Sequence, residues 1–259
     1  MAKRLADGET LLALLRAAEM THNTVEVSPR TMARIAGVLY VVIIVLALFA
    51  PFPVAPSWLM HGDVSATLDK ILESKSLYAL GGAAELMVYA CDIGVALIFY
   101  ELLKPVSRSI ALLGLFFRLA FATIASANVL NHFAPLLFMS GAEGLTAFKP
   151  DQLRTLAVTF IRLHTIGFDI ALVFFGFHCV VVGYLFFRSN FFPRVLGALL
   201  ALAGLCYLTN TFASFLSPAF ATHLSRYTLV LGVGEVLSAL WLLVIGVNVQ
   251  RWKEQARAG

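Results

Sequence analysis

Ionisable side chains interrupt the long apolar runs of this 259-residue chain at eight positions. They are Glu85, Asp92, Arg118, His132, His164, Asp169, His178 and Glu235. A charge or an imidazole at membrane depth is costly, so such a residue usually faces the interior of a helix bundle and marks a pathway, a proton relay or a bound ion. The sequence therefore predicts a multi-pass membrane protein with a polar interior, without naming the molecule that this interior serves.

The composition agrees with a membrane location. Hydrophobic residues make up 60% of the chain and charged residues 13%, whereas soluble domains carry about 25% charged residues. A bilayer core needs roughly 20 apolar residues per helix. The apolar runs therefore predict an all-α integral membrane bundle of six transmembrane helices. The expected spans are about residues 34–54, 77–103, 109–138, 152–187, 194–216 and 227–249.

These spans imply one six-helix transmembrane domain, residues 31–250. Residues 1–30 are expected as a cytoplasmic tail or as an amphipathic helix on the membrane surface. They lack the apolar core and cleavage site of a signal peptide. Residues 251–259 follow the domain as a C-terminal tail.

The charges between the spans predict the orientation, because Lys and Arg collect on the cytoplasmic side of membrane proteins. With six spans, both tails and two loops share one side, which holds twelve Lys and Arg residues against five on the other side. Both termini are therefore expected in the cytoplasm. The same residues produce most of the net charge of +4, so this charge does not indicate nucleic-acid binding. The expected partner is the lipid bilayer.

Two connections on the outer side carry helical signals. Val64, Leu68 and Ile71 have the spacing of one helix face, which predicts a short helix on the outer surface. Pro150 followed by Asp151 is typical of a helix start, and it would place the beginning of the fourth helix outside the bilayer.

The three cysteines do not form a recognisable site. Cys91, Cys179 and Cys206 are isolated, and all fall within predicted spans. Without a CxxC pair, neither a disulfide framework nor a thiolate zinc site is indicated. We expect them to pack as small apolar residues.

Five polar residues from five helices are expected at similar depth in the outer half of the membrane: Glu85, His132, His164, Asn210 and Glu235. His132 and His164 with Glu85 or Glu235 would suit zinc or another transition metal. No HExxH or similar spacing supports such a site. The alternative is that each histidine is a hydrogen-bonding group between helices.

A second layer is expected closer to the inner side. Asp92 lies one heptad after Glu85, and Arg118 is its expected ion-pair partner, because an unpaired charge there would be costly. His178 belongs to the same layer, and Asp169 lies between the two layers. These four residues are the candidates for catalysis or proton transfer. The alternative is a structural ion pair.

Several stretches of the chain resemble a known family. They are Arg34-Ile35-Ala36-Gly37, Asp92 through Val106, Leu163 through Cys179, Gly183-Tyr184-Leu185 and Arg188 through Gly197. Together they resemble the bacterial membrane family DUF 4386, a domain of unknown function, over about residues 30–249. The resemblance implies a multi-pass protein of the bacterial cytoplasmic membrane with Asp92, Arg118, His164 and His178 as characteristic positions. It implies no activity, substrate or cofactor.

Three functions remain open from the sequence, and it does not decide whether the chain is an enzyme. The first is a membrane-embedded, metal-dependent hydrolase of a lipid-like substrate. The second is a small proton- or ion-coupled transporter or sensor, which at this length would need to form a homo-oligomer. The third is an accessory membrane subunit without chemistry of its own.

Overall fold

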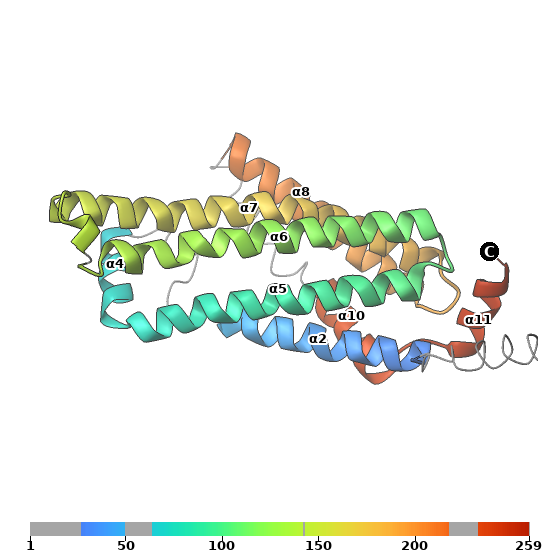
Figure 1. Cartoon of the computed structure of the whole chain (residues 1–259). Coiled ribbons are helices and arrows are strands. Elements are labelled where there is room, and N and C mark those ends of the chain that lie inside the picture. Colours follow the sequence, from blue (N-terminus) through green and yellow to red (C-terminus); the bar gives the residue numbers. More distant parts are fainter. Residues whose placement is uncertain (1–26, 50–63, 142, 218–232, 259) are drawn as a thin grey trace, which may run out of the picture.

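The computed structural model describes residues 27–49, 64–141, 143–217 and 233–258, and every regular element within these ranges is helical (Figure 1). The elements are α2 (Pro29–Phe49), α4 (Val64–Glu73), α5 (Lys75–Leu103), α6 (Arg108–Phe138), the 3₁₀ turn η1 (Glu143–Leu145), α7 (Pro150–Arg188), α8 (Arg194–Leu216), α10 (Val233–Val244) and α11 (Val249–Ala258). The predicted all-α fold is confirmed. The expected tail or surface helix at residues 1–30 lies almost entirely outside the described residues.

Within the described residues, five helices are long and apolar enough to cross a membrane: α2, α5, α6, α7 and α8. The pair α10 and α11 would raise this number to six if it formed one broken span. The chain is therefore a multi-pass helical membrane protein. For α5, α6, α7 and α8 the helix ends lie within two residues of the predicted spans. With 39 residues, α7 is about 58 Å long, and it therefore extends beyond a bilayer core of about 30 Å.

The last span differs from its prediction, because α10 ends at Val244 and not at residue 249. Gly246 follows in the left-handed conformation, with φ of 70°. Its amide donates a hydrogen bond of 2.8 Å to the carbonyl of Trp241. A glycine in this conformation closes a helix end, so the chain turns and α11 begins at 103° to α10. The segment expected as a C-terminal tail is therefore helical over most of its length.

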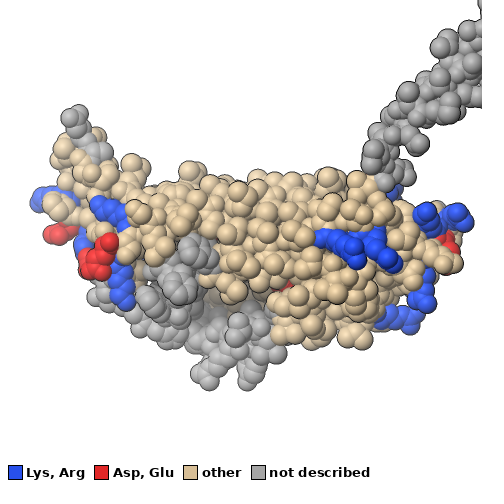
Figure 2. All heavy atoms as spheres, turned by 90° about the horizontal axis from the view of Figure 1, so that it is seen from below, with Lys and Arg blue, Asp and Glu red and all other residues tan. Residues whose placement is uncertain are grey.

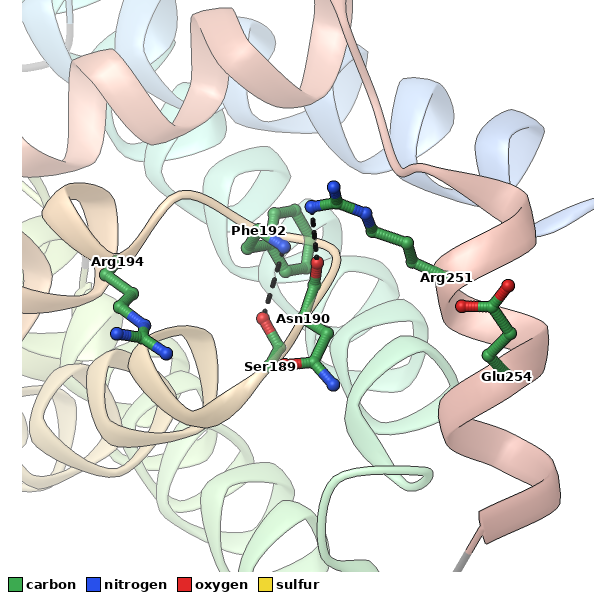
Figure 3. Close-up of a pocket in the computed structure, with 6 residues that line it drawn as sticks. All are labelled: Ser189, Asn190, Phe192, Arg194, Arg251 and Glu254. Carbon is green, nitrogen blue, oxygen red and sulfur yellow. Dashed lines mark hydrogen bonds between the residues drawn. The ribbon is translucent and has the colours of Figure 1, made fainter.

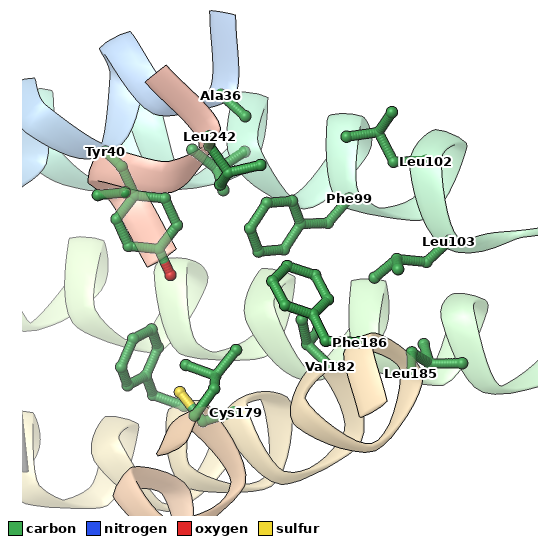
Figure 4. Packing of buried hydrophobic residues seen from close by; sticks show 14 of the residues in the cluster. Ala36, Tyr40, Phe99, Leu102, Leu103, Cys179, Val182, Leu185, Phe186 and Leu242 are labelled. Atoms are coloured by element: carbon green, nitrogen blue, oxygen red, sulfur yellow. The ribbon is translucent and has the colours of Figure 1, made fainter. Parts of the chain in front are cut away.

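The long helices pack as an antiparallel bundle (Figure 1). In this bundle α6 lies between α5 and α7, α8 packs on α7, and α2 packs on α5 and α10. Figure 4 shows the apolar core at their meeting point, where Tyr40, Phe99, Cys179, Phe186 and Leu242 lie side by side. The core gathers residues from α2, α5, α6, α7, α8 and α10, and it fixes how these helices face one another.

The short helix α4 confirms the prediction of a helix at this position. Leu68 and Ile71 are completely buried and pack with Tyr78, Ala157 and Ile161 in a second apolar cluster. This cluster joins α4 to the start of α5 and to α7. It lies at the end of the bundle where α7 begins, and it supports the backbone around Tyr78.

Charged side chains gather toward the two ends of the bundle. Figure 2 shows Lys and Arg residues near both ends of one face, with a broad and nearly uncharged band between them. Apolar side chains with large exposed fractions, such as Leu130, Leu97 and Val195, are spread over the long helices. This distribution is expected of helices whose outer faces contact lipid.

The three cysteines are free.

Candidate functional site

Three of the predicted site residues meet between α5, α6 and α7. Glu85, His132 and His164 form what we call the Glu85 cluster, in which one ligand atom from each residue lies within 4.8 Å of the others. Oε1 of Glu85 is 3.3 Å from Nδ1 of His132 and 3.4 Å from Nε2 of His164. His132 is buried, and Glu85 and His164 are partly buried. The helix packing therefore brings two imidazoles and a carboxylate to one point.

The far nitrogen of each ring faces a backbone carbonyl. Nε2 of His132 is 2.9 Å from the carbonyl oxygen of Tyr78, whose ring stacks on the imidazole at 4.1 Å. Nδ1 of His164 is 3.3 Å from the carbonyl oxygen of Asn128, and the Asn128 amide donates to the His164 carbonyl at 2.7 Å. A neutral His132 that donates its proton to the Tyr78 carbonyl presents its other nitrogen to Glu85 as a lone pair. Nδ1 of His164 also lies 3.2 Å from the side-chain amide of Asn128, and a neutral His164 that accepts from this amide carries its proton on Nε2, facing Glu85.

The carboxylate of Glu85 has spare capacity to accept. Its Oε2 atom is buried and has no hydrogen-bond partner, although a buried polar atom without a partner is costly. With His132 neutral, its Nδ1 atom and Oε1 of Glu85 are two acceptors that face each other at 3.3 Å. Such a set requires either a shared proton, which makes one ring an imidazolium, or a cation.

Two glycines make room for the cluster. A Cβ atom at Gly82 would lie 2.8 Å from Cδ2 of His132, and a Cβ atom at Gly167 would lie 2.1 Å from Oδ1 of Asn128. The absence of a side chain at Gly82 lets α5 approach His132. At Gly167 it lets Asn128 reach the backbone of α7 and hold His164 in place.

The fourth predicted metal ligand, Glu235, lies outside this cluster. Helix α10 packs mainly on α2 and α8, so the Glu235 carboxylate accepts a hydrogen bond of 2.6 Å from the hydroxyl of Tyr207. The depth expected for Glu235 was counted from a helix start at residue 227, and that count did not reveal which helices surround it.

A second group of polar residues surrounds the guanidinium of Arg118. Tyr40, Asp92, Arg118 and His178 form what we call the Arg118 cluster, and all four are at least 98% buried. Arg118 donates to Oδ1 of Asp92 through Nε, at 2.8 Å, and also through Nη2. The predicted ion pair is therefore confirmed. Nη1 is 2.9 Å from the hydroxyl of Tyr40 and 3.1 Å from Nε2 of His178.

The Arg118 cluster is well satisfied by its own contacts. Nδ1 of His178 is 2.8 Å from the carbonyl of Gly114, so a proton on Nδ1 leaves Nε2 free to accept from Arg118. The guanidinium also lies 4.8 Å from the ring centre of Tyr40 and 5.5 Å from that of Phe175, within cation–π range. In contrast to the Glu85 cluster, its donors and acceptors match.

Asp169 belongs to neither cluster. Its Oδ2 accepts a hydrogen bond of 3.2 Å from Ser214 on α8. The structure therefore places it between α7 and α8, away from the other candidates for catalysis.

The sequence prediction missed the contributions of Tyr40 and Tyr78. Tyrosine is enriched at the two membrane surfaces, whereas Tyr40 lies in the middle of an apolar helix and is completely buried. A tyrosine at mid-span was the available signal for a partner of Arg118. Tyr78 contributes its carbonyl oxygen and its ring face, and no pattern in the sequence reports on a carbonyl.

Comparison with known proteins gives the family. A family model described as "Domain of unknown function (DUF4386)" matches residues 35–246. The chain belongs to this family. An uncharacterized protein of Archaeoglobus fulgidus is 30% identical over 171 residues, which cover 66% of this chain and 85% of the relative. No solved structure gives a significant match. The matched residues include every member of both clusters, and the family description names no activity.

Proposed function

We propose that this protein is an intramembrane metalloenzyme whose Glu85 cluster binds one transition-metal ion and hydrolyses a lipid-like substrate. The observation that carries the proposal is the meeting of one carboxylate with two imidazoles, whose far ring nitrogens lie near backbone carbonyls. Histidines that bind metals almost always donate their other N–H group to a carboxylate, a carbonyl or a water. His132 has this arrangement with the carbonyl of Tyr78. Nδ1 of His164 lies 3.3 Å from the backbone carbonyl of Asn128 and 3.2 Å from its side-chain amide, and metal binding at Nε2 would place the ring proton on Nδ1, toward the carbonyl.

The distances suit a tetrahedral metal ion. Zinc binds histidine nitrogen and carboxylate oxygen at about 2.0–2.2 Å, which places neighbouring ligand atoms about 3.4 Å apart. The 3.3 Å and 3.4 Å separations from Glu85 match this spacing, and the three ligand atoms all lie within 4.8 Å of one another. Two histidines and one carboxylate form the ligand set of catalytic zinc sites that keep a fourth position open. Zinc is therefore the best match.

A metal ion held by three protein ligands would keep its fourth coordination position open for a water molecule, and this bound water would allow hydrolysis. A metal ion held by three protein ligands lowers the pKa of a bound water and supplies a nucleophile. The unpartnered Oε2 atom of Glu85 is the proposed acceptor of the proton that this water loses. The substrate would be an ester of an amphiphile that enters from the bilayer, because the cluster lies between helices with apolar outer faces.

A metal analysis of the protein purified without chelator tests the proposal. We expect about one zinc, iron or manganese ion per chain, lost in Glu85→Gln and in the double variant His132→Ala/His164→Ala. Glu235→Gln is the matched control, since it makes the same change at a carboxylate outside the cluster, and it should keep the metal. A metal-free wild-type protein after incubation with each ion would overturn the proposal.

The hydrolytic step has a separate test. Wild-type protein in bilayer discs should cleave a fluorogenic long-chain ester, and both chelation and Glu85→Gln should abolish cleavage. A metal-loaded protein that cleaves neither carboxylic nor phosphoric esters of lipids would leave the metal site standing and reject the hydrolase.

A proton-coupled transporter or sensor is the second candidate, favoured by the Arg118 cluster. Asp92, Arg118 and His178 share hydrogen bonds in the interior of the bundle, where ionisable groups often relay protons. Asp92→Asn at normal expression should then abolish pH-dependent flux or ligand binding. Behaviour that does not change between about pH 5 and 8 would reject this candidate.

We further propose that the protein lies in the plasma membrane, with six spans and with both termini in the cytoplasm. The excess of Lys and Arg in the tails and in the loops on their side supports this orientation. The sixth span would include α10, with α11 on the cytoplasmic surface. Single cysteines introduced at residues 108 and 149 into a cysteine-free background should react with an impermeant thiol reagent from opposite sides. Labelling of both from one side would contradict the arrangement.

A further inference from the structure

The turn between α7 and α8 forms a polar pocket of about 470 Å³ together with α11 (Figure 3). Its polar groups contact their own neighbours. Arg251 donates to the carbonyl of Asn190 at 3.4 Å, and Glu254 accepts a hydrogen bond of 3.3 Å from Gln250. Figure 3 shows Arg194 on the opposite side of the turn from Arg251 and Glu254. These groups do not meet at one point, whereas polar groups do meet farther along the interface between α7 and α8.

Two pairs of glycines show how α7 is aligned with α8. A Cβ atom at Gly183 would lie 2.7 Å from the carbonyl oxygen of Gly197, and a Cβ atom at Gly176 would lie 3.1 Å from that of Gly204. The two glycines of each helix are one heptad apart, so they lie on the same helix face. The antiparallel helices therefore contact each other along one row, in which successive heptads of α7 and α8 meet.

The next position in this row is polar. One heptad from Gly176 on α7 is Asp169, and one heptad from Gly204 on α8 is Thr211. Ser214, about one turn after Thr211, supports this alignment, because its hydroxyl oxygen lies 3.2 Å from Oδ2 of Asp169. Thr211 is only 1% exposed. The carboxylate and the two hydroxyl groups therefore enter the same part of the interface.

The two hydroxyl groups are not satisfied by the protein. Ser214 has one hydroxyl proton, and its oxygen lies 2.8 Å from the carbonyl of Thr211 as well as 3.2 Å from Asp169. A proton given to the nearer carbonyl leaves a lone pair facing the carboxylate. Oγ1 of Thr211 is buried and has no hydrogen-bond partner in the described part of the chain, which is costly. Both hydroxyl oxygens can therefore act as ligands.

Asp169 adds a negative charge without a counter-charge. No Lys, Arg or His side chain among the described residues forms an ion pair with it, and a charge within a span is costly unless it is paired. A water molecule would satisfy Thr211 but would leave the charge. A proton on Asp169 would remove the charge but would leave Thr211 without a partner. A cation held by the carboxylate and both hydroxyl groups meets both needs.

The ligand atoms favour a hard, singly charged ion. All three residues offer oxygen atoms, which hard cations prefer, and a single carboxylate balances one positive charge. Thr211 lies five residues, about 7.5 Å, before the end of α8 at Leu216, which places the site near one surface of the membrane. Asp169 is turned by about 140° from His164 around α7, so the site faces α8 and is separate from the Glu85 cluster.

We propose that Asp169, Thr211 and Ser214 bind a monovalent metal cation between α7 and α8. Asp169 supplies the negative charge, and the two hydroxyl groups supply neutral oxygen ligands. The bound ion joins the two helices beyond their glycine contacts and stabilises the folded protein.

Thermal unfolding of the full chain in detergent tests this site. Sodium chloride or potassium chloride replaces choline chloride at constant ionic strength. We expect one of the two ions to raise the melting temperature by about 5–10 °C once its concentration is about 100 times its Kd. Asp169→Asn should remove this rise, and Thr211→Val should shift it to about tenfold higher ion concentration. Asp151→Asn is the matched control and should keep the rise, because Asp151 is exposed in the first turn of α7.

The proposal is wrong if neither ion changes the melting temperature of the wild-type protein. It is also wrong if the rise persists in Asp169→Asn, or if Asp151→Asn loses the rise to the same extent. A melting temperature that depends on pH through Asp169, without an effect of either ion, would make a proton the partner of the carboxylate and would also reject the cation.

Discussion

Nδ1 of His132 lies 3.3 Å from Oε1 of Glu85, while the other nitrogen of the same ring lies 2.9 Å from the carbonyl of Tyr78. The carbonyl can accept only the ring's N–H group, so a neutral His132 turns a lone pair toward a carboxylate. Two acceptors at this distance need a proton or a metal ion between them.

Asn128 should tune the metal affinity without binding the metal. Its side-chain amide donates to the His164 carbonyl, and its backbone carbonyl faces Nδ1 of the His164 ring. Asn128→Ala should therefore hold the His164 imidazole less firmly. Loss of such a supporting residue typically lowers affinity about 10–100-fold. Asn131→Ala, which removes only a donor to Asn128, should have a smaller effect. Competition titrations with a zinc indicator measure both, and equal affinities in Asn128→Ala and wild type would contradict this role.

Gly167 should be intolerant of any side chain. The Cβ atom of Gly167→Ala would lie 2.1 Å from Oδ1 of Asn128, so Asn128 must move. We expect a stability loss of about 1–3 kcal/mol together with weaker metal binding. Gly144→Ala is the control, since a Cβ atom there meets nothing within 4 Å. Thermal unfolding in detergent with and without zinc checks the prediction, which fails if the two variants behave alike.

The ion pair in the Arg118 cluster should behave as a structural unit. Asp92→Asn leaves the buried guanidinium without its counter-charge, and breaking a buried pair typically costs about 3–5 kcal/mol. The double variant Asp92→Leu/Arg118→Met removes both charges and should recover much of this loss. Chemical unfolding of wild type, Asp92→Asn and the double variant measures these differences in the free energy of unfolding. A single variant as stable as wild type would show that Asp92 has a role other than stability, as the transporter candidate requires.

Metal binding should weaken as the pH falls. An imidazole binds a metal only in its neutral form, and free histidine side chains titrate near about pH 6.5. Protons therefore compete for two of the three ligands, and the apparent affinity should decrease from pH 8 toward pH 5. Zinc titrations at several pH values measure this change in affinity. An affinity that does not depend on pH would contradict the metal site.

The sequence predicted most of the fold, because membrane spans follow from composition. The ends of α5 to α8 were found from apolar runs and proline positions. The end of α10 was missed, because its cause is one hydrogen bond at Gly246 within a run that stays apolar beyond it.

The candidate site was predicted less completely. Depth along each helix brought Glu85, His132 and His164 together correctly, because α5, α6 and α7 are neighbours. The same count failed for Glu235, because depth does not tell which helix face or neighbour a side chain meets. Partners that act through a backbone carbonyl, such as Tyr78 and Gly114, have no signature in the residue types.

The most direct test of the central claim is X-ray absorption spectroscopy of the protein loaded with one equivalent of zinc. We expect two imidazole nitrogens and at least one oxygen at about 2.0–2.2 Å from the metal. The imidazole scattering should disappear in His132→Ala/His164→Ala and persist in Glu235→Gln. A zinc ion surrounded by water oxygens alone, or by sulfur, would contradict the proposed site.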